Sequence, residues 1–315
     1  MLHVPIDYGD TRALDQVLKA YSRYFRILGA VHLAASKSVA ESLKNPRKYY
    51  DNNVVKMEGF LRVLGRHGVG NVVFSSSATV YGCLPPEITT NTALKEDMVP
   101  ILDPRVPREE ILNTTAKLTP YGISKILGEA LVARFVAENP KRKAAVFRLF
   151  NPVGCDSSGY IKENPRDGQR CGGGVMQMIR KAVEGNTPFE VYGTKRENGD
   201  GSCVRDFVHV GDIASGIVMG FESCLYGIHG KGKERVRVYN LTSGNGVSVK
   251  RLVNEVEKES GVVVRMKECE GREGDVAVSV GDIEKARREL GWIPELGIRK
   301  VCRDFCRAYG IKKYI

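Results

Sequence analysis

Apolar positions in the first half of the chain alternate between two spacings. Within residues 12–25, apolar residues such as Leu14 and Leu18 recur at helical spacing, and residues 27–33 then form a continuous apolar run typical of a buried strand. The same succession recurs twice, with helical patterns over 46–66 and 122–136 and apolar runs over 71–76 and 144–150. Strands separated by helices predict an α/β protein with a parallel, doubly wound sheet.

The carboxyl ends of such strands are where we expect a ligand. In open α/β sheets, ligands bind beyond the carboxyl ends of the strands. Three segments follow directly on the predicted strands, at residues 34–37, 75–77 and 150–151. Candidate catalytic and binding residues are therefore expected in these segments.

The second half of the chain has a less regular pattern. A glycine triplet at 172–174 precedes a helical segment, and the last predicted helix, 282–290, begins at an Asp and is followed by Gly291, as helix capping favours. Short strands are predicted at 190–192 and 206–210, and helices at 212–222 and 248–259. We interpret residues 1–150 as a cofactor-binding domain and 151–315 as a smaller substrate-binding lobe.

Composition narrows the class of protein. With 42% hydrophobic and 27% charged residues, the 315-residue chain can bury a sizeable core. No apolar run approaches the roughly 20 residues of a membrane span. Residues 1–10 lack the basic start and apolar core of a signal peptide. We therefore expect a cytoplasmic protein without a membrane segment.

Cysteine spacing and charge exclude two further classes. The eight cysteines form no C-x-x-C pair, so we expect reduced thiols and no metal site. The net charge of +11 invites a nucleic-acid hypothesis, but the basic clusters are short, and no nucleic-acid motif accompanies them. A basic surface that favours a small anionic substrate is the preferred interpretation, and no nucleic-acid partner is expected.

Tyr121 and Lys125 are the first candidate catalytic residues. They stand four residues apart in a helical pattern, a spacing that places them on one helix face about one turn apart. A tyrosine normally titrates near pH 10, so it is a poor base unless a neighbouring positive charge stabilises its anion. On spacing alone, two unrelated surface residues are the preferred interpretation.

Ser77 adds a second element to this pair. It lies in SSSATVYG (75–82), which follows directly on a predicted strand and so brings hydroxyl groups to the carboxyl end. A serine hydroxyl can donate to a substrate oxygen and pass a proton to a tyrosinate. Ser77, Tyr121 and Lys125 together predict a proton-transfer relay beside a site of hydride acceptance.

Seven segments in order carry a family resemblance. SSSATVYG, PYGISK and RLFNPVG resemble the UDP-galactose/UDP-glucose 4-epimerases of the extended short-chain dehydrogenase/reductase family. LAASKSVAES, NPRKYYDNNV, DGSCVRDFVHVGDIA and GREGD continue the resemblance, which runs from about Asp10 to the C-terminus. It implies a Rossmann-type sheet, bound NAD, a UDP-sugar substrate and a homodimer formed by helices near 46–66 and 121–136.

The resemblance also implies residue roles. Asp10 would hold the adenine end of NAD. Ser77 and Tyr121 would act on the C4 hydroxyl of the sugar, while Lys125 would bind the nicotinamide ribose. The other residues implied at the cofactor are Ala34, Ala35, Lys37, Asn52, Ser77, Tyr121 and Phe150. Those implied at the UDP-sugar are Lys37, Ser77, Tyr121, Phe150, Asn151, Gly174, Tyr192, Arg205, Arg272, Asp275 and Ser279. The arginines suit a diphosphate because a guanidinium binds phosphate oxygens in a bidentate way.

Some of these residues also have structural interpretations. Phe150 ends an apolar strand and could belong to the core alone. Arg205 and Asp206 could pair across a turn. His209, in the apolar FVHV run, is interpreted as a buried neutral histidine rather than a catalytic one.

The start of the chain departs from the family pattern. No G-x-G-x-x-G or G-x-x-G-x-x-G precedes Asp10, although such glycines let backbone amides approach the NAD diphosphate at a helix N-terminus. Residues 2–10 resemble the third strand of the dinucleotide-binding unit, so the sheet is expected to lack its first strands. On this reading the chain would bind NAD poorly, and we interpret it as a truncated gene model rather than a genuine short protein.

Smaller departures concern the substrate. Gly173, Gly174 and Val175 replace an Asn-Asn-Leu that contacts the diphosphate in the family, and Leu149 replaces a Tyr. Ser279 is small where epimerases of narrow specificity carry Tyr, which predicts tolerance of UDP-GlcNAc and UDP-GalNAc. Residues 82–118 form a longer polar connection than in compact members.

Three functional hypotheses follow. The first is an active epimerase, and the second is another nucleotide-sugar enzyme of the same fold, such as a dehydratase. The third is an inactive remnant that binds UDP-sugars without NAD. Ala78 and Thr79 after Ser77 count against a dehydratase, which usually has acidic residues there.

Overall fold

The chain is described from a computed structural model. It covers residues 3–85, 87–88, 92–102, 118–163, 174–193, 199–227, 234–271 and 276–312. The contacts divide the chain into two compact units, each described separately below. The first comprises Met1–Cys83, Val99–Arg148 and Ile217–Tyr239, and the second Leu84–Met98, Leu149–Gly216 and Asn240–Ile315. The sequence-based boundary near residue 150 stays a prediction.

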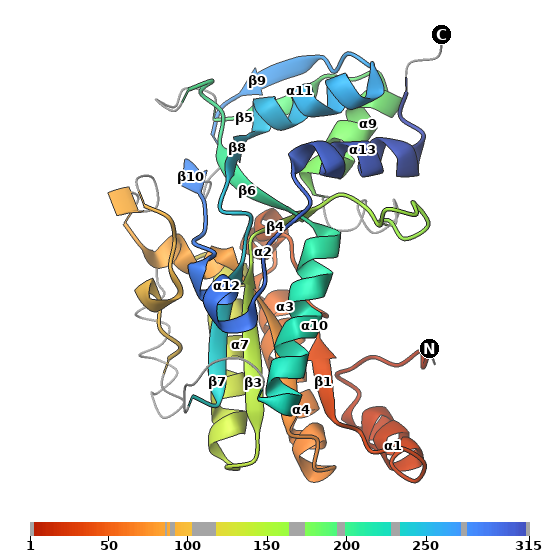
Figure 1. The fold of residues 1–315 in the computed structure, drawn as a ribbon, viewed down its shortest axis with the longest axis vertical. Helices are drawn as coiled ribbons and strands as arrows, with labels where there is room; N and C mark the ends of the chain where they lie inside the picture. The colour runs from red at the N-terminus through yellow and green to blue at the C-terminus, as the bar shows by residue number, and fades with distance from the viewer. Residues whose placement is uncertain are drawn as a thin grey trace. The chain divides into compact units, whose positions relative to one another are not determined.

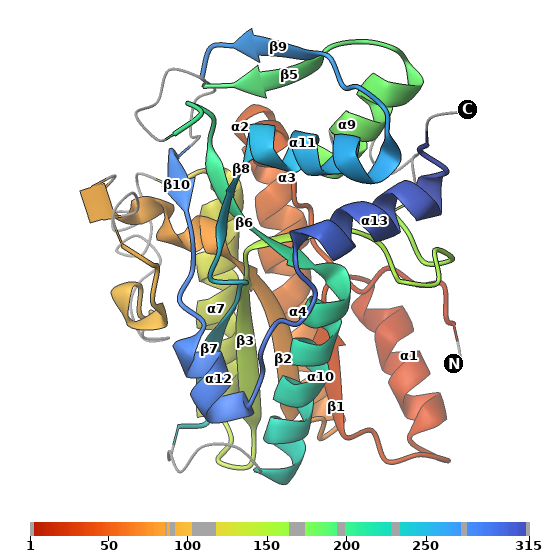
Figure 2. The ribbon, with the colours of Figure 1, turned by 45° about the horizontal axis from the view of Figure 1, so that its top comes forward.

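A four-stranded sheet organises the first unit. Its order is β1 (Gly29–His32), β2 (Asn71–Ser77), β3 (Lys143–Leu149) and β7 (Val236–Leu241), as Figure 2 shows. β1 and β2 pair in parallel, with Gly29 opposite Asn71 and His32 opposite Phe74. The centres of β2 and β3 are buried, as their apolar runs predict. The sequence-based α/β class with a parallel sheet is confirmed.

Helices cover both faces of this sheet. α4 (Lys56–Arg66) and α7 (Pro120–Ala137) lie on one side, and the part of α10 (Val210–Tyr226) that belongs to this unit, from Ile217 on, lies on the other (Figure 1). α7 approaches β2 closely at Gly128, where an added Cβ would lie 2.6 Å from Cζ of Phe74. The remaining helices of this unit are α1 (Thr11–Tyr21), α2 (Val39–Lys44) and α3 (Pro46–Tyr50).

Two predicted elements of this unit differ in the structure. The helix predicted over 46–66 is interrupted, because Asp51–Val55 form a π-helical segment between α3 and α4. The strand predicted over 2–10 is wrong, since residues 3–10 form no strand. Instead, Gly9 N donates to the Asp7 carboxylate at 2.8 Å and Asp10 N donates to Asp7 O at 2.9 Å, so local turn bonds replace strand pairing.

β1 is an edge strand of the described sheet. It pairs with β2 on one side, and among the described residues no strand pairs with its other side. Val31 is 41% exposed and Leu33, directly after the strand, is 55% exposed. An edge with exposed apolar side chains is a surface on which further chain can pair.

The second unit contains two smaller sheets. In one, β6 (Val204–His209) lies between β10 (Val278–Ser279) and β4 (Asn151–Val153) and also pairs with β8 (Gly246–Ser248). In the other, β5 (Phe189–Tyr192) pairs in parallel with β9 (Met266–Cys269). The helices of this unit are α9 (Val175–Glu184), α11 (Val249–Ser260), α12 (Glu284–Leu290) and α13 (Ile298–Tyr309).

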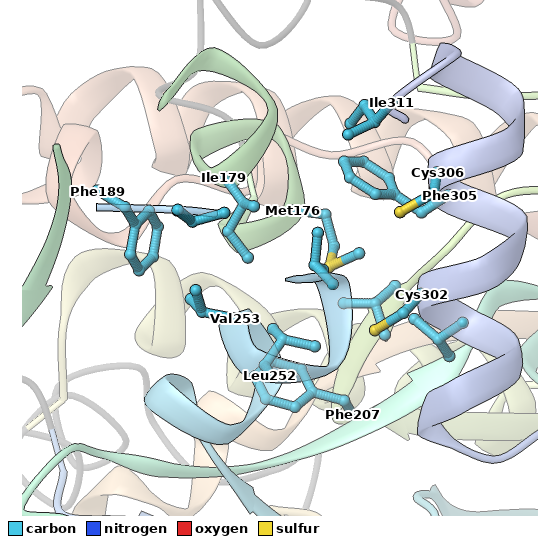
Figure 3. Packing of buried hydrophobic residues seen from close by; sticks show 14 of the residues in the cluster. Met176, Ile179, Phe189, Phe207, Leu252, Val253, Cys302, Phe305, Cys306 and Ile311 are labelled. Carbon is cyan, nitrogen blue, oxygen red and sulfur yellow. The ribbon is translucent and has the colours of Figure 1, made fainter. Parts of the chain in front are cut away.

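The core of the second unit lies among α9, α11 and α13. Ile179, Leu252 and Phe305 are fully buried there, together with the Cys302 thiol (Figure 3). The six cysteines whose side chains are described are free thiols. Gly291 follows α12 in the left-handed conformation and forms its C-cap, in line with the predicted helix end, whereas the helix begins at Glu284 rather than at residue 282. No described helix is both long and apolar enough to cross a membrane.

Candidate functional site

Ser77, Tyr121 and Lys125 come together at the carboxyl end of β2. Ser77 is the last residue of that strand, and α7 begins at Pro120, so Tyr121 lies in its first turn and Lys125 one turn further. Oγ1 of Thr119 caps the helix by accepting from Gly122 N at 3.3 Å. Proline at the first helical position fixes the same start.

Lys125 is a buried ammonium. Its Nζ donates to Ser75 O at 2.7 Å and lies 5.8 Å from the centroid of the Tyr121 ring and 5.1 Å from that of Phe74. Burial lowers the pKa of Lys125 to about 8, and the negative charge of Glu129 acts in the opposite direction. Lys125 therefore carries its charge near neutral pH while titrating far below an ordinary lysine.

Tyr121 is a buried phenol. Burial raises the pKa of Tyr121, while its hydrogen bond with Ser77 lowers it. Tyr49, also buried, packs its ring edge against Tyr121, with centroids 6.1 Å apart and an interplanar angle of 78°. The hydroxyl–phenol–ammonium arrangement can accept a proton at Tyr121 and return it, with the tyrosinate stabilised by Lys125.

Asn53 connects this group to the segment after β1. Its Oδ1 accepts from Ser36 N at 2.8 Å, and its Nδ2 donates to Ser36 O at 2.9 Å and to Ser124 Oγ at 3.0 Å. Ser124 Oγ in turn donates to Tyr121 O at 2.7 Å. The sequence interpretation chose the neighbouring Asn52, whose Nδ2 donates to Ser36 Oγ at 3.2 Å, and missed Asn53.

The other cofactor candidates of the first unit lie at strand and helix ends. Ala34, Ala35 and Lys37 follow β1, with Ala34 and Lys37 exposed. Asp10 caps α1, since its Oδ1 accepts from Arg12 N at 3.1 Å and from Ala13 N at 3.0 Å. A helix cap is thus a structural role that Asp10 already has, and its role at a cofactor stays a prediction.

A buried ion pair behind Ser77 was missed from the sequence. Glu129 on α7 and Arg148 on β3 are almost fully buried, and Arg148 Nη2 lies 2.8 Å from Glu129 Oε2. Burial alone would lower the pKa of Arg148, but the Glu129 charge raises it. The sequence did contain a signal for this pair, because Glu129 and Arg148 are both charged residues within otherwise apolar patterns. A buried charge needs a partner.

The substrate candidates of the second unit gather around β4 and β6. Asn151 begins β4, and its Nδ2 donates to Asp206 O at 3.0 Å. Phe150 is buried, with its backbone N donating to Leu241 O at 3.2 Å. Ser279 of β10 lies opposite Arg205 of β6 in the parallel pairing, so these two predicted residues are neighbours.

Gly174 and Tyr192 belong to other elements of the second unit. Gly174 is the residue before α9 and provides no side-chain cap. Tyr192 ends β5, and its hydroxyl donates to the Glu190 carboxylate. Arg272 and Asp275 lie outside the described residues, as does most of the 82–118 connection.

The structural interpretation of Arg205 and Asp206 as a pair is wrong. They are adjacent on β6 and so point to opposite faces. Asp206 is fully buried and accepts from Ser243 N at 2.7 Å and Gly244 N at 3.0 Å, while Arg205 Nη1 donates to Val204 O at 2.9 Å. Asp206 therefore holds the 242–244 turn.

His209 is buried, as predicted. Its Nδ1 accepts from Gly211 N at 2.9 Å, so that nitrogen carries no proton. Its Nε2 lies 3.3 Å from Asp304 Oδ2 and donates to it. These contacts are all within the second unit and give the histidine a structural role.

Comparison with known proteins defines the class. Residues 2–240 match the model of the "NAD dependent epimerase/dehydratase family". UDP-glucose 4-epimerase 1 of Oryza sativa subsp. japonica is 34% identical over 304 residues, which cover 95% of this chain and 76% of that protein. The chain therefore belongs to the NAD dependent epimerase/dehydratase family.

Solved structures agree with this assignment. The UDP-glucose 4-epimerase of Stenotrophomonas maltophila, solved with bound NAD and formylated UDP-arabinopyranose, is 30% identical with a TM-score of 0.80 over 98% of this chain and 82% of that chain. The enzyme of Bifidobacterium longum, in complex with NAD+ and UDP, is 30% identical with a TM-score of 0.77 over the same shares. The resemblance to UDP-glucose 4-epimerases read from the sequence is confirmed.

Proposed function

We propose that this chain is a UDP-hexose 4-epimerase that interconverts UDP-galactose and UDP-glucose with bound NAD. The observation that carries the proposal is the Ser77–Tyr121–Lys125 group at the carboxyl end of a parallel strand, in a chain whose relatives are UDP-glucose 4-epimerases. Tyr121 and Lys125 are buried and lie one turn apart on α7. This holds the ammonium close to the phenol, as a proton-transfer group requires.

The residues near Ser77 fit the nicotinamide end of the cofactor. Lys125 uses one N–H on Ser75 O, which leaves further donors for a ribose hydroxyl. Thr79 Oγ1 is a buried hydroxyl without a hydrogen-bond partner among the described residues, so it can bond to a ligand. The 315 residues contain no G-x-G-x-x-G, and we assign no residue to the diphosphate.

The chain's own residues move the proton. When bound, NAD+ supplies the reversible acceptance of hydride from C4 of the sugar. Tyr121 accepts the C4 hydroxyl proton, directly or through Ser77, as the hydroxyl becomes a 4-keto group. Lys125 stabilises the tyrosinate that starts this step. After the sugar has turned over, Tyr121 returns the proton to the oxygen, so the cycle has no net redox change.

Residues of the second unit are proposed to bind the UDP-sugar. Arg205 would contact the diphosphate, and the small Ser279 on the neighbouring strand would leave room for an N-acetyl group, so we extend the substrates to UDP-GlcNAc and UDP-GalNAc. The other proposed contacts are Lys37, Phe150, Asn151, Gly174, Tyr192, Arg272 and Asp275.

Two measurements test the proposed function. Purified protein is denatured and its released NAD is quantified per chain, and the native protein is incubated with UDP-galactose with and without added NAD+. We expect near-stoichiometric NAD and formation of UDP-glucose. Absence of both NAD and conversion, even with NAD+ supplied, would favour the alternative of a UDP-sugar-binding remnant.

We also propose a cytoplasmic homodimer formed through α4 and α7. Most of α7 is buried within the chain, so partly exposed residues such as Val55, beside α4, would supply much of the contact. Light scattering coupled to size exclusion should give twice the 34.8 kDa chain mass. A monomer at micromolar concentration contradicts this proposal.

A further inference from the structure

A buried carboxylate joins three elements of the first unit one residue away from Ser77. Glu129 Oε1 on α7 accepts from Ser76 Oγ of β2 at 2.5 Å and from Arg148 Nε of β3 at 3.0 Å. Arg148 Nη2 donates to the other oxygen, Oε2, at 2.8 Å. This bidentate pair fixes direction as well as distance.

The same arginine holds the chain that follows Ser77. Arg148 Nη1 donates to the Tyr81 hydroxyl at 3.2 Å, and Nη2 donates to Val99 O at 2.6 Å. A buried ion pair adds little net stability over an apolar pair of similar volume, because desolvation offsets the attraction. Instead, this pair can fix the position of α7 along β2 and the position of the turn after Ser77.

Glu129 also lies on the catalytic face of α7. Tyr121, Lys125 and Glu129 are spaced four residues apart, so each lies about one turn beyond the last, or roughly 6 Å along the axis. Three consecutive residues of β2 each bond to one member of this face: Ser75 to Lys125, Ser76 to Glu129 and Ser77 to Tyr121.

We propose that Glu129, held by Arg148, is a positioning residue for the proposed epimerisation. It keeps the Ser77 hydroxyl at Tyr121 through Ser76, and its negative charge keeps the Lys125 ammonium protonated. The catalytic part of this inference rests on the proposed function, whereas its structural and electrostatic parts concern the free protein.

Few other ionisable groups face Lys125 in the described residues. Tyr121 and Glu129 come from α7, and His32 comes from β1. β2 presents the Phe74 ring and the Ser75 carbonyl, and Arg148 of β3 acts through Glu129. Burial, followed by the Lys125 charge, lowers the pKa of His32 to about 4, so His32 is neutral when Lys125 titrates. Among the described residues, Glu129 is therefore the anion that acts on Lys125.

The first test is Glu129→Gln, read by NMR titration of protein labelled at the lysine ε carbon. Without the carboxylate, Arg148 keeps its charge and Lys125 loses the negative charge that raises its pKa, so the Lys125 pKa should fall below about 8. The alkaline limb of kcat should move down by the same amount, with KM little changed. Glu138→Gln is the matched control, because Glu138, exposed just after α7, pairs with Arg142 Nη1 at 2.9 Å and has no contact with Lys125 in the described residues. It should move neither value.

The second test is Ser76→Ala, which removes the hydrogen bond from Ser76 to Glu129 and leaves the charges of Glu129 and Arg148 in place. We expect kcat to fall about 3- to 10-fold, the worth of one such bond, with the Lys125 titration unchanged. The Tyr121 pKa, followed by ultraviolet absorbance, should rise as the Ser77 bond loosens.

An unshifted Lys125 titration in folded Glu129→Gln overturns the proposal. If that variant does not fold, Ser76→Ala decides, and an unchanged kcat together with an unchanged Tyr121 titration overturns it. Failure of the proposed function looks different. The unsubstituted chain would then not convert UDP-galactose, while the Lys125 and Tyr121 titrations would still report on Glu129.

Discussion

The ionisable side chains around β2 are buried, and their burial determines their chemistry. Lys125 titrates near pH 8 because desolvation disfavours its charge, and Tyr121 resists ionisation for the same reason. The hydrogen bond with Ser77 offsets part of that penalty at Tyr121. Ser77, Tyr121 and Lys125 were named from motif order, and the structure brings them together, while their catalytic roles stay a proposal. Glu129 was not recognised, although its place in an apolar helix required a buried partner.

Tyr121→Phe removes the proton acceptor and leaves the ring packing against Tyr49. General acid–base catalysis contributes about 10²–10⁴-fold, so kcat for UDP-galactose conversion should fall by that factor with the fold intact by circular dichroism. Tyr24→Phe, at an exposed tyrosine, is the control. Activity of Tyr121→Phe near that of the control would show that another group moves the proton.

Ser279→Tyr tests substrate breadth. A tyrosine opposite Arg205 would fill the space proposed for an N-acetyl group, so turnover of UDP-GalNAc should be lost while that of UDP-galactose persists. The ratio of kcat/KM for the two substrates is the measurement. Equal turnover of both sugars by the variant would sink the proposed role of Ser279.

His32 predicts a pH dependence of stability. Burial holds its pKa near 4, below that of the unfolded chain, so the unfolded state binds more protons between about pH 6.5 and 4. Its stabilising contribution is fully present above that window and is lost as pH falls through it. The free energy of unfolding, measured with urea, should fall less between pH 7 and pH 5 for His32→Phe than for the unsubstituted chain or for His3→Gln. Identical losses would exclude His32 as the source.

The regular elements were predictable where their periodicity was strong. β2, β3 and α7 were found within one or two residues, because apolar runs and a long helical pattern specify them. The π-helical turn at Asp51–Val55 was not predictable, since its residues fit an ordinary helical pattern. Within it, Asn53 bonds to Ser36, a contact that the sequence pattern does not indicate. Residues 3–10 have an apolar start, but Asp7 and Gly9 favour a turn.

Gly128→Ala tests the contact between α7 and β2. Alanine normally gains about 1 kcal/mol over glycine in a helix, but here its Cβ would lie 2.6 Å from the Phe74 ring, which packs under Lys125. Overpacking costs about 1–3 kcal/mol, so Tm and kcat should both fall.

Gly65→Ala in α4 is the matched control for that substitution. Its Cβ would lie 2.6 Å from Arg142 Nη2, the far end of a flexible side chain, and 3.5 Å from Phe135 Cε2, which is an ordinary van der Waals contact. This variant should keep or raise Tm. A Gly128→Ala variant as stable as Gly65→Ala would contradict the close α7–β2 packing.

The motifs that indicate the family are spread along the whole chain. Both units contribute predicted site residues, and the relatives bind NAD or UDP-sugars in their solved structures. The expectation that the sheet lacks its first strands agrees with β1 being an edge strand among the described residues. Arg205 and Ser279 could be named from motifs, but their adjacency came only from the register of β6 and β10.

The most direct measurement follows the hydrogen at C4 of the sugar. UDP-galactose carrying deuterium at C4 is incubated with the purified protein and NAD+ in ordinary water, and the product is read by NMR. The account predicts UDP-glucose that retains deuterium at C4, with no net formation of NADH. No conversion, or a product that has lost the label to water, would contradict it.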